Sequence, residues 1–563
     1  MSNWLDSAAT RRMGILTFAL CFALAGAAAQ QPSAPSPQSS GQATPQSGQA
    51  SAGSPGKQKP NAETRITPQQ AQQLFGLVDQ LLKFSSDETG LPIKSPVKRQ
   101  LTTRNAVESY LSEKFNEDED AKRMQRSEIV LKKFGLLDRD FDLKPFLLAL
   151  LKEQIEAYYD PKTKTVNLLD WIDVDEQKPV LAHELTHALQ DQHLDLDKWS
   201  DQTPTDVSLN SGGDTEHLAK DEIDTAREAV VEGQATAVMM DDILKPMGRS
   251  LIKDPEVVEF IKQQMAGSEN SPILARAPLL LSESLLFPYR EGLSFEQDLW
   301  MDKGQEAAFT GALDRPPSSS WEIINPREYE KGHLPSVPLL PDIHPLVDEL
   351  YKPYDIGQVG QLDLHILAGL FGGDAAARDL TPAWDGGLYW AGQLRSATPA
   401  EQSSTKSVVL LYLSVWKSSA SAEAFARLYE DELGRKYSGV RLQSSAQTRD
   451  TPHSDEQVYA TNEGPVVITT RGKLVFVTES FDLPLARQLT ALVLDAQGAG
   501  EMKMASAPRL SPLPGVSDFR AVMDGPREPL AGNFVHFFAN CGVMKAPVDA
   551  GFAARSLPMI TGH

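Results

Sequence analysis

Cysteine is nearly absent from this chain, since Cys21 and Cys541 are its only two in 563 residues. Cys21 lies in an N-terminal segment that we expect to be removed, which leaves Cys541 alone in the mature chain. A lone cysteine excludes an intramolecular disulfide bond and any zinc site built from cysteine ligands. The stability of the mature protein must therefore come from packing and from bound metal.

Positive charge is scarce as well. The chain has 54 Lys and Arg residues against 76 Asp and Glu residues, so its formal net charge is -22. Such acidity argues against a nucleic-acid-binding protein, because nothing offsets the repulsion between the protein and phosphate groups. The hydrophobic fraction of 41% and the charged fraction of 23% are those of a globular protein, long enough here for two or more domains.

The apolar run near the N-terminus is too short to cross a membrane. Residues 13–26 give about 14 apolar residues, whereas a spanning helix needs about 20. The run follows Arg11-Arg12 and precedes Ala27-Ala28-Ala29, which is the arrangement of a cleavable signal peptide. We therefore predict a signal peptide at 1–29 and an exported protein, periplasmic or secreted, with no stable membrane span after cleavage.

Order is expected mainly between residues 64 and 497. Residues 30–63 are almost entirely small or polar and cannot bury enough apolar surface to offset the entropy of ordering. We predict a disordered low-complexity linker there, and a weakly ordered tail at 498–563, which is rich in Gly, Pro and Ala. Between them we predict a mainly helical domain at 64–399 and an α+β region at 400–497, packed on or beside it.

The spacing of apolar residues predicts the main elements. Two β-prone runs around a Pro-containing turn predict a hairpin at 155–169, followed by a helix from about residue 177. After residue 286 loops are expected to dominate, including Pro288-Tyr289-Arg290-Glu291-Gly292. Further helices are expected from Thr67-Pro68 and at 104–115, 120–134, 142–152, 214–242, 254–264, 279–286, 420–437 and 485–497. Strands are expected at 408–416, 457–460, 466–470 and 473–478.

The most specific motif is His183-Glu184-Leu185-Thr186-His187, which has the form H-E-x-x-H. Residues i and i+4 share one helix face, so the two imidazoles can bind one metal ion. Glu184 follows the first ligand directly, where its carboxylate can reach a water on that ion. Chance predicts about 0.02 occurrences of even the looser H-[DE]-x-x-H in this composition. The apolar residues around the motif indicate that both histidines are partly buried, and a buried imidazole needs a partner.

A catalytic zinc ion usually has a third protein ligand, and three candidates compete for this place. His193 stands ten residues after His183, the metzincin spacing, but Gln190 occupies the position where that pattern needs a helix-breaking glycine. An unbroken helix would carry His193 about 9 Å beyond His187, at about 1.5 Å per residue. Glu228 and Glu232, one turn apart on a second predicted helix, are therefore the better candidates. We prefer Glu232, because Gly233 after it permits a close helix-to-helix approach, and expect Glu228 to orient a ligand.

The segment 183–192, HELTHALQDQ, followed by 232–236, EGQAT, is similar to a group of bacterial gluzincin-like zinc metallopeptidases. This resemblance covers roughly residues 67–392, and weaker matches include Tyr158-Tyr159-Asp160-Pro161 and Trp384-Asp385-Gly386-Gly387. It implies that 64–399 is a zincin-like metallopeptidase domain, with an edge hairpin, an H-E-x-x-H helix and a second ligand helix. Asn325-Pro326 stands where the resemblance leads us to expect His-Pro, so we assign no catalytic role there.

The expected function is that of an exported zinc-dependent metallopeptidase acting on a peptide or protein. Zinc would be held by His183, His187 and Glu232, with Glu184 as the general base. Two alternatives remain: an exported zincin-fold binding protein without proteolytic activity, and a zinc hydrolase of a non-peptide amide or ester. The intact Glu184 favours catalysis over mere binding.

The negative charge that develops on the substrate oxygen needs a further hydrogen-bond donor besides zinc. Tyr289 is the most plausible donor, and Tyr329 and His217 are the alternatives.

Overall fold

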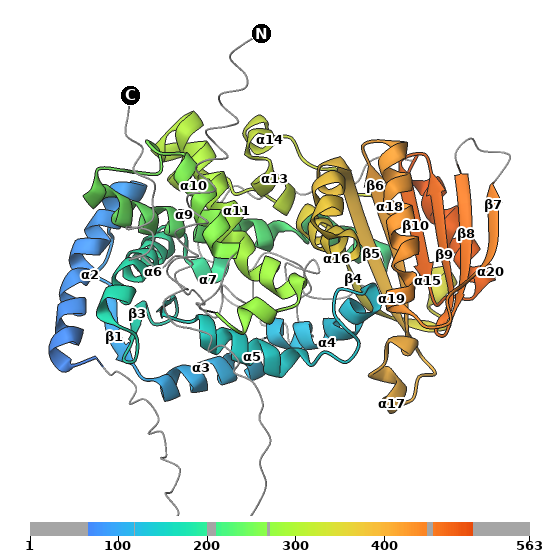
Figure 1. The fold of residues 1–563 in the computed structure, drawn as a ribbon, viewed down its shortest axis with the longest axis horizontal. Helices are drawn as coiled ribbons and strands as arrows, with labels where there is room; N and C mark the ends of the chain where they lie inside the picture. Colours follow the sequence, from blue (N-terminus) through green and yellow to red (C-terminus); the bar gives the residue numbers. More distant parts are fainter. Residues whose placement is uncertain (1–65, 118, 200–209, 267–270, 448–453, 499–563) are drawn as a thin grey trace, which may run out of the picture. The chain divides into compact units, whose positions relative to one another are not determined.

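The computed structural model describes residues 66–117, 119–199, 210–266, 271–447 and 454–498. These residues form a mainly helical α+β fold with two sheets, which confirms the predicted fold class at this level (Figure 1). All of them belong to one unit of the chain, 63–563. The predicted signal peptide, the predicted linker and all but the first residue of the predicted tail lie outside the described residues.

The first described helix, α2 (Pro68–Thr89), begins where the sequence predicts. The Gln70 N–H donates to Thr67 Oγ1, and the Thr67 N–H donates to Gln70 Oε1, so the helix start is capped in both directions. Gly90 ends the helix in the left-handed conformation at φ 73°. The strand β1 (Lys98–Thr102) and three predicted helices follow: α3 (Arg104–Glu117), α4 (Glu119–Phe134) and α5 (Leu143–Gln154).

The smaller sheet has the strand order β1-β3-β2. The predicted hairpin is present, since β2 (Ala157–Asp160) pairs antiparallel with β3 (Thr165–Leu169). The strand β1 pairs parallel with β3 on its other side and has no counterpart among the predictions. Its sequence, KRQLT, is mostly polar and exposed and so lacks the apolar alternation that marks a strand. The strand β2 is thus an outer strand of this sheet.

The helix α6 (Val174–Leu194) carries the H-E-x-x-H motif. It begins three residues before the predicted start, because the side chain of Asp173 accepts a hydrogen bond from the Asp175 N–H and caps the first turn. It continues without a break through Gln190 and His193 and ends at Asp195, in the left-handed conformation. The short helix α7 (Leu196–Trp199) follows.

Two long helices pack side by side in the core. These are α9 (Ile223–Leu244), which is buried along nearly its whole length, and α11 (Leu279–Lys303). The prediction of a loop at 288–292 is wrong, because α11 continues through Pro288. An interior proline costs about 3 kcal/mol, whereas burying one large apolar side chain stabilises by roughly 1.5–3 kcal/mol. Several such side chains of α11 are buried, so packing outweighs the helix propensity: Leu285, Phe287, Leu293 and Phe295.

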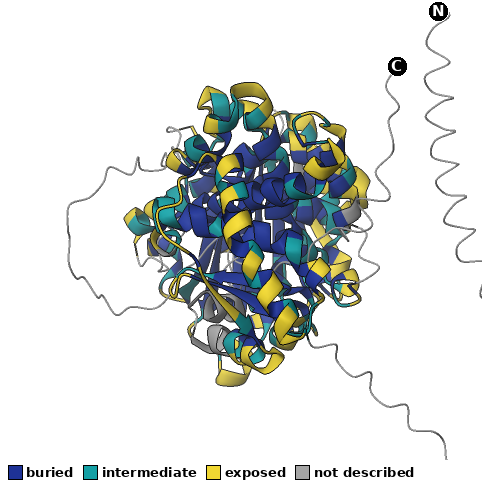
Figure 2. Cartoon of the chain, turned by 90° about the vertical axis from the view of Figure 1, so that its left-hand side faces the viewer, coloured by how far each residue is buried: buried dark blue, intermediate teal, exposed yellow. Residues whose placement is uncertain are grey.

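Shorter elements precede α9, join it to α11, and lead from α11 to the second sheet. Buried residues gather in the middle of the view in Figure 2, and exposed residues line its rim. The connecting elements are α8 (Ser211–Lys220), η1 (Lys245–Met247), α10 (Glu256–Ala266), η2 (Leu274–Arg276), the π-helix η3 (Ala307–Gly311), α12 (Ala312–Asp314), α13 (Ser320–Ile324), α14 (Pro326–Lys331) and α15 (His344–Val347).

The larger sheet has the order β4-β5-β6-β10-β9-β8-β7 and is antiparallel throughout. Alternate residues of β6 enter different cores: Leu410 faces the side of α18, and Leu411 faces the side of α20. Helices therefore cover both faces. The strands are β4 (Tyr351–Gln358), β5 (Trp384–Leu394), β6 (Val408–Trp416), β7 (Arg441–Gln447), β8 (Ser454–Thr461), β9 (Gly464–Arg471) and β10 (Leu474–Glu479). The remaining elements are α16 (Gln361–Leu380), η4 (Thr381–Ala383), α17 (Pro399–Gln402), η5 (Thr405–Ser407), α18 (Ser419–Asp431), α19 (Leu433–Lys436) and α20 (Leu483–Ala496).

The predicted boundary at residue 400 falls between two paired strands of this sheet. The strand β5 precedes it, β6 follows it, and the two pair from Trp384 to Gln393. Lys133 of α4 also forms a buried ion pair of 3.1 Å with Glu463, between β8 and β9. The sheet and the helices of the first half are thus joined through buried contacts. No helix among the described residues is long and apolar enough to cross a membrane.

Candidate metal centre

The structure brings together the three side chains that the sequence proposes as metal ligands. His183 Nε2 lies 2.9 Å from His187 Nε2 and 3.1 Å from Glu232 Oε2, and the latter two atoms are 3.5 Å apart. Among the described residues, these three form the group of His, Cys, Asp or Glu side chains that could hold a metal ion, because their ligand atoms all lie within 4.8 Å of one another. It comes from two helices, α6 and α9, which pack directly against each other.

The donor set fits a metal ion. Tetrahedral coordination with bonds of about 2.0–2.2 Å would place ligand atoms about 3.3–3.6 Å apart. The separation of 3.5 Å lies in this range, and those of 2.9 and 3.1 Å are shorter, so binding would move the His183 nitrogen slightly away from the other two atoms. Two imidazole nitrogens and a carboxylate oxygen are also the donors of many catalytic zinc sites. The His183 side chain is 1% exposed, that of Glu232 7% and that of His187 12%, so His187 is the most solvent-accessible of the three. Three such polar groups facing one another in the interior could hold a metal ion.

Glu184 is held by the outer strand of the smaller sheet. The Tyr159 backbone N–H donates a hydrogen bond of 2.7 Å to Glu184 Oε2. Burial and the negative charge of Glu232 raise the pKa of Glu184, while the charge of His187 and the Tyr159 hydrogen bond lower it, and the outcome is about 7. A carboxyl group with a pKa near neutrality can both take and give a proton.

Two of the candidate ligands, Glu232 and His187, carry opposite charges that shift each other's pKa. Burial by itself would raise the pKa of Glu232, but the charge of His187 and hydrogen bonds to both histidines lower it to about 2. Burial lowers the pKa of His187, yet Glu232 and Glu184 raise it to about 9. Burial and the neighbouring His187 lower the pKa of His183. Glu232 is therefore a carboxylate in the metal-free protein, and it stabilises one positive charge on the two imidazoles.

The other two candidates for the third ligand do not join this group. His193 lies six residues beyond His187 on the unbroken helix α6, and its Nε2 is 2.9 Å from Asp314 Oδ1. Glu228 is buried one turn before Glu232, and its charge acts on Tyr289. Glu232 is therefore the carboxylate that meets the histidines.

Gly233 serves a different contact from the one expected. A Cβ atom on Gly233 would lie 2.3 Å from the carbonyl carbon of Gly292, and one on Gly292 would lie 2.1 Å from the Ala229 carbonyl oxygen. The two glycines thus permit the close crossing of α9 and α11, rather than that of α9 and α6. Since Tyr289 stands one turn before Gly292 on α11, this crossing brings its ring against the metal ligands.

Of the three expected hydrogen-bond donors, Tyr289 is the one at this centre. Its hydroxyl forms a hydrogen bond with Glu232, and its ring centroid lies 6.2 Å from that of His183. Burial and the surrounding carboxylates raise the pKa of Tyr289 well above its ordinary value, so the hydroxyl keeps its proton. Tyr329 instead donates to the Arg315 carbonyl, and His217 lies beside Asp221. Among the described residues, Tyr289 is therefore the candidate in contact with the ligand cluster.

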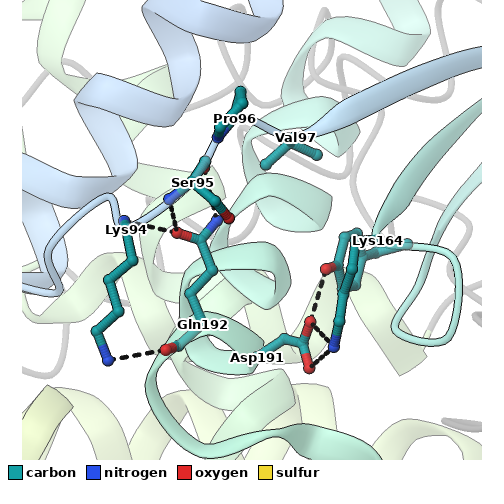
Figure 3. Close-up of a pocket in the computed structure, with 8 residues that line it drawn as sticks. Lys94, Ser95, Pro96, Val97, Lys164, Asp191 and Gln192 are labelled. Carbon is teal, nitrogen blue, oxygen red and sulfur yellow. Dashed lines mark hydrogen bonds and ion pairs between the residues drawn. The ribbon is translucent and has the colours of Figure 1, made fainter.

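Asp191 and Gln192, near the end of α6, hold two neighbouring segments of the chain. Asp191 accepts a hydrogen bond of 2.7 Å from the Tyr159 hydroxyl. It also accepts hydrogen bonds of 2.7 and 2.9 Å from Lys164 of the hairpin turn (Figure 3). Gln192 Oε1 accepts from the backbone N–H groups of Lys94 and Ser95. A cavity of about 250 Å³ lies among these residues. The anchoring fixes the hairpin, and with it the Tyr159 amide, against α6.

Sequence reasoning did not identify Tyr159 as part of the site. Its contribution is a backbone N–H, which every residue except proline carries, so no side-chain pattern could reveal it.

Comparison of the chain with protein-family models, with curated proteins and with solved structures finds no match.

Proposed function

We propose that this protein is a zinc-dependent metallopeptidase with a zincin-like core made of the β2–β3 hairpin, α6 and α9. Its ligands are His183, His187 and Glu232. The observation that carries the proposal is the position of Glu184, whose buried carboxylate interacts with the charges of His187 and Glu232 and is oriented by a hydrogen bond at one oxygen. A site that only stored metal would have no use for a general base held in this way.

In the proposed reaction, Glu184 transfers the proton and Tyr289 stabilises the developing negative charge. The chemistry that a zinc ion supplies here is Lewis-acid polarisation of a water molecule and of the scissile carbonyl. Because the Tyr159 N–H holds Glu184 Oε2, Glu184 takes the water proton on Oε1 and later gives it to the leaving amine nitrogen. The Tyr289 hydroxyl donates a hydrogen bond to the negative charge that develops on the carbonyl oxygen.

A peptide substrate suits the surroundings of the base. The strand β2 is an outer strand, and the amide of its residue Tyr159 points to Glu184. An extended peptide that pairs with this strand would bring its backbone carbonyl toward the ligand cluster. Such pairing recognises the backbone common to all peptides. Export through the predicted signal peptide at 1–29 belongs to the same proposal, which gives a periplasmic or secreted enzyme.

The test combines metal analysis with a digest. The purified full chain should contain about one zinc ion per molecule and cleave members of a peptide library, and a chelator should abolish the cleavage. The variant Glu184→Gln should keep the zinc and lose about 10²–10⁴-fold in turnover. The matched control is Glu176→Gln, an exposed residue in the first turn of the same helix, which should leave turnover unchanged.

Each outcome selects among the candidate functions. Unchanged turnover by zinc-loaded Glu184→Gln would exclude Glu184 as the base. A zinc-loaded wild-type protein that cleaves no peptide but hydrolyses a model ester or acyl amide would be a non-peptide hydrolase. One that does neither would be an exported binding protein.

A further inference from the structure

Gln190 stands three residues after His187 on α6, so the two side chains share one helix face. Gln190 is fully buried, and its Oε1 lies 2.8 Å from His187 Nδ1. The other end of the amide, Nε2, donates hydrogen bonds of 3.0 Å to the Val231 carbonyl and to Gln234 Oε1. The amide thus connects the outer nitrogen of a ligand histidine to the helix that supplies Glu232.

Gln234 extends this connection to the backbone. Its Nε2 lies 3.0 Å from the carbonyl oxygens of both Ala308 and Phe309, in the π-helix η3. A backbone carbonyl can only accept a hydrogen bond, so Gln234 must present its NH₂ group there and its Oε1 to Gln190. The Val231 carbonyl imposes the same choice on Gln190. The orientation of both amides is therefore set by backbone groups that cannot reverse their role.

The orientation of the Gln190 amide decides which nitrogen of His187 carries the proton. Gln190 must present its oxygen to His187, and an oxygen can only accept, so His187 Nδ1 carries the proton. A histidine that binds metal is neutral and has a single N–H group, so with the proton on Nδ1 the His187 Nε2 offers its lone pair to the metal. That is the nitrogen that faces His183 and Glu232.

We propose that Gln190 is a positioning residue that holds His187 as an Nε2 ligand, with Gln234 fixing the orientation of Gln190. The inference rests on the proposed metal-binding function. Hydrogen bonds of this kind to ligand histidines commonly contribute 10–100-fold to metal affinity. They also raise the basicity of the ligand nitrogen and keep the ring from rotating.

The experiment measures the zinc dissociation constant of the full chain by competition with a chelator. Gln190→Met keeps the size of the side chain and removes the acceptor, so zinc should bind about 10–100-fold more weakly. Gln190→Glu keeps an acceptor for Nδ1–H but loses both donations, so its stability should fall while its zinc affinity stays within about 3-fold of wild type. This separation of affinity from stability distinguishes positioning from mere packing.

The matched control is Gln297→Met. Gln297 is a buried glutamine of α11 that donates 2.8 Å to the Leu251 carbonyl and does not belong to the amide chain. The same substitution there should lower stability and leave zinc affinity unchanged. A second readout is the Nδ1–H proton of His187 in zinc-loaded protein labelled with ¹⁵N-histidine. It should exchange slowly with water in the wild type and rapidly in Gln190→Met.

Three results would overturn the inference. These are unaltered zinc affinity in Gln190→Met, an equal loss in Gln190→Glu, and an equal loss in Gln297→Met. A wild-type chain that binds no zinc would overturn this inference together with the proposed function. A zinc-binding chain without peptidase activity would overturn the proposed function alone, because the affinities are measured without turnover.

Discussion

The Tyr159 backbone N–H donates to Glu184 Oε2 at 2.7 Å, and the hydroxyl of the same tyrosine donates to Asp191 Oδ2 at 2.7 Å. Both acceptors lie on α6, seven residues and thus two turns apart. Two hydrogen bonds therefore join one residue of the outer strand to the helix that carries His183 and His187. This double contact sets the position of the strand relative to the base, which is the relationship that a hydrolase of extended peptides needs.

Glu232→Gln should weaken zinc binding by at least about 100-fold, because it removes the negative charge that faces both histidines. Glu228→Gln, one turn earlier on the same helix, should cost less than Glu232→Gln, because the Glu228 carboxylate is not among the three clustered ligand groups. The control is His193→Gln, which should bind zinc normally, since His193 pairs with Asp314 instead. Equilibrium dialysis with zinc measures all three. A larger loss in Glu228→Gln or His193→Gln than in Glu232→Gln would move the third ligand to that residue.

Tyr289→Phe should keep zinc and lower kcat by about 10²–10³-fold, because the variant lacks the hydroxyl that we propose as the donor to the developing oxyanion. Tyr329→Phe is the control. Tyr329 is also buried, but its hydroxyl donates to the Arg315 backbone carbonyl and not to a ligand. It should lower stability and leave kcat unchanged. Steady-state kinetics on one cleaved peptide separates the two variants, and equal kcat values in both would remove Tyr289 from the mechanism.

Gly292→Ala should destabilise the protein by about 1–3 kcal/mol, because the new methyl group would lie 2.1 Å from the Ala229 carbonyl oxygen. Forcing α9 and α11 apart should also displace Tyr289 and reduce turnover. Gly76→Ala, in an exposed part of α2 with no neighbour within 4 Å, should instead stabilise by up to about 1 kcal/mol. Urea denaturation of the three proteins provides the comparison. A neutral Gly292→Ala would mean that the crossing is not tight.

Glu222→Gln should change how stability depends on pH. Burial, together with the charge of Asp363, raises the pKa of Glu222 from 4.5 to about 8, although Ser320 donates two hydrogen bonds to it. Between pH 4.5 and about 8 the folded protein therefore holds a proton that the unfolded chain has lost. Stability from this group then falls as pH rises through that window, by at most about 1.4 kcal/mol per pH unit.

The measurement is the free energy of unfolding at several pH values from 5 to 8.5, for wild type and Glu222→Gln. Because the amide carries no charge at any pH, the variant should lose this part of the slope and be relatively more stable at the alkaline end. Parallel curves for the two proteins would show that Glu222 has an ordinary pKa in the folded state.

Local sequence patterns predicted elements well where spacing alone decides them. The i, i+4 spacing of His183 and His187 places both on one helix face whatever surrounds them, and the capped start at Thr67 follows from its own neighbours. The 288–292 segment was mispredicted because Pro and Gly are read as helix-ending residues. Packing against α9 outweighs that local preference, so the segment is helical.

The sequence by itself determined the chemistry that is possible: two imidazoles one turn apart, a carboxylate beside them, and two glutamates on a later helix. Only the tertiary structure decided which glutamate meets the histidines and which tyrosine lies against them. Both depend on the crossing of α9 with α6 and α11, where contacts join residues about 50 to 65 positions apart in the chain. Gln190 shows the same division, because its spacing from His187 is local, while the carbonyls that orient its amide come from two other parts of the fold.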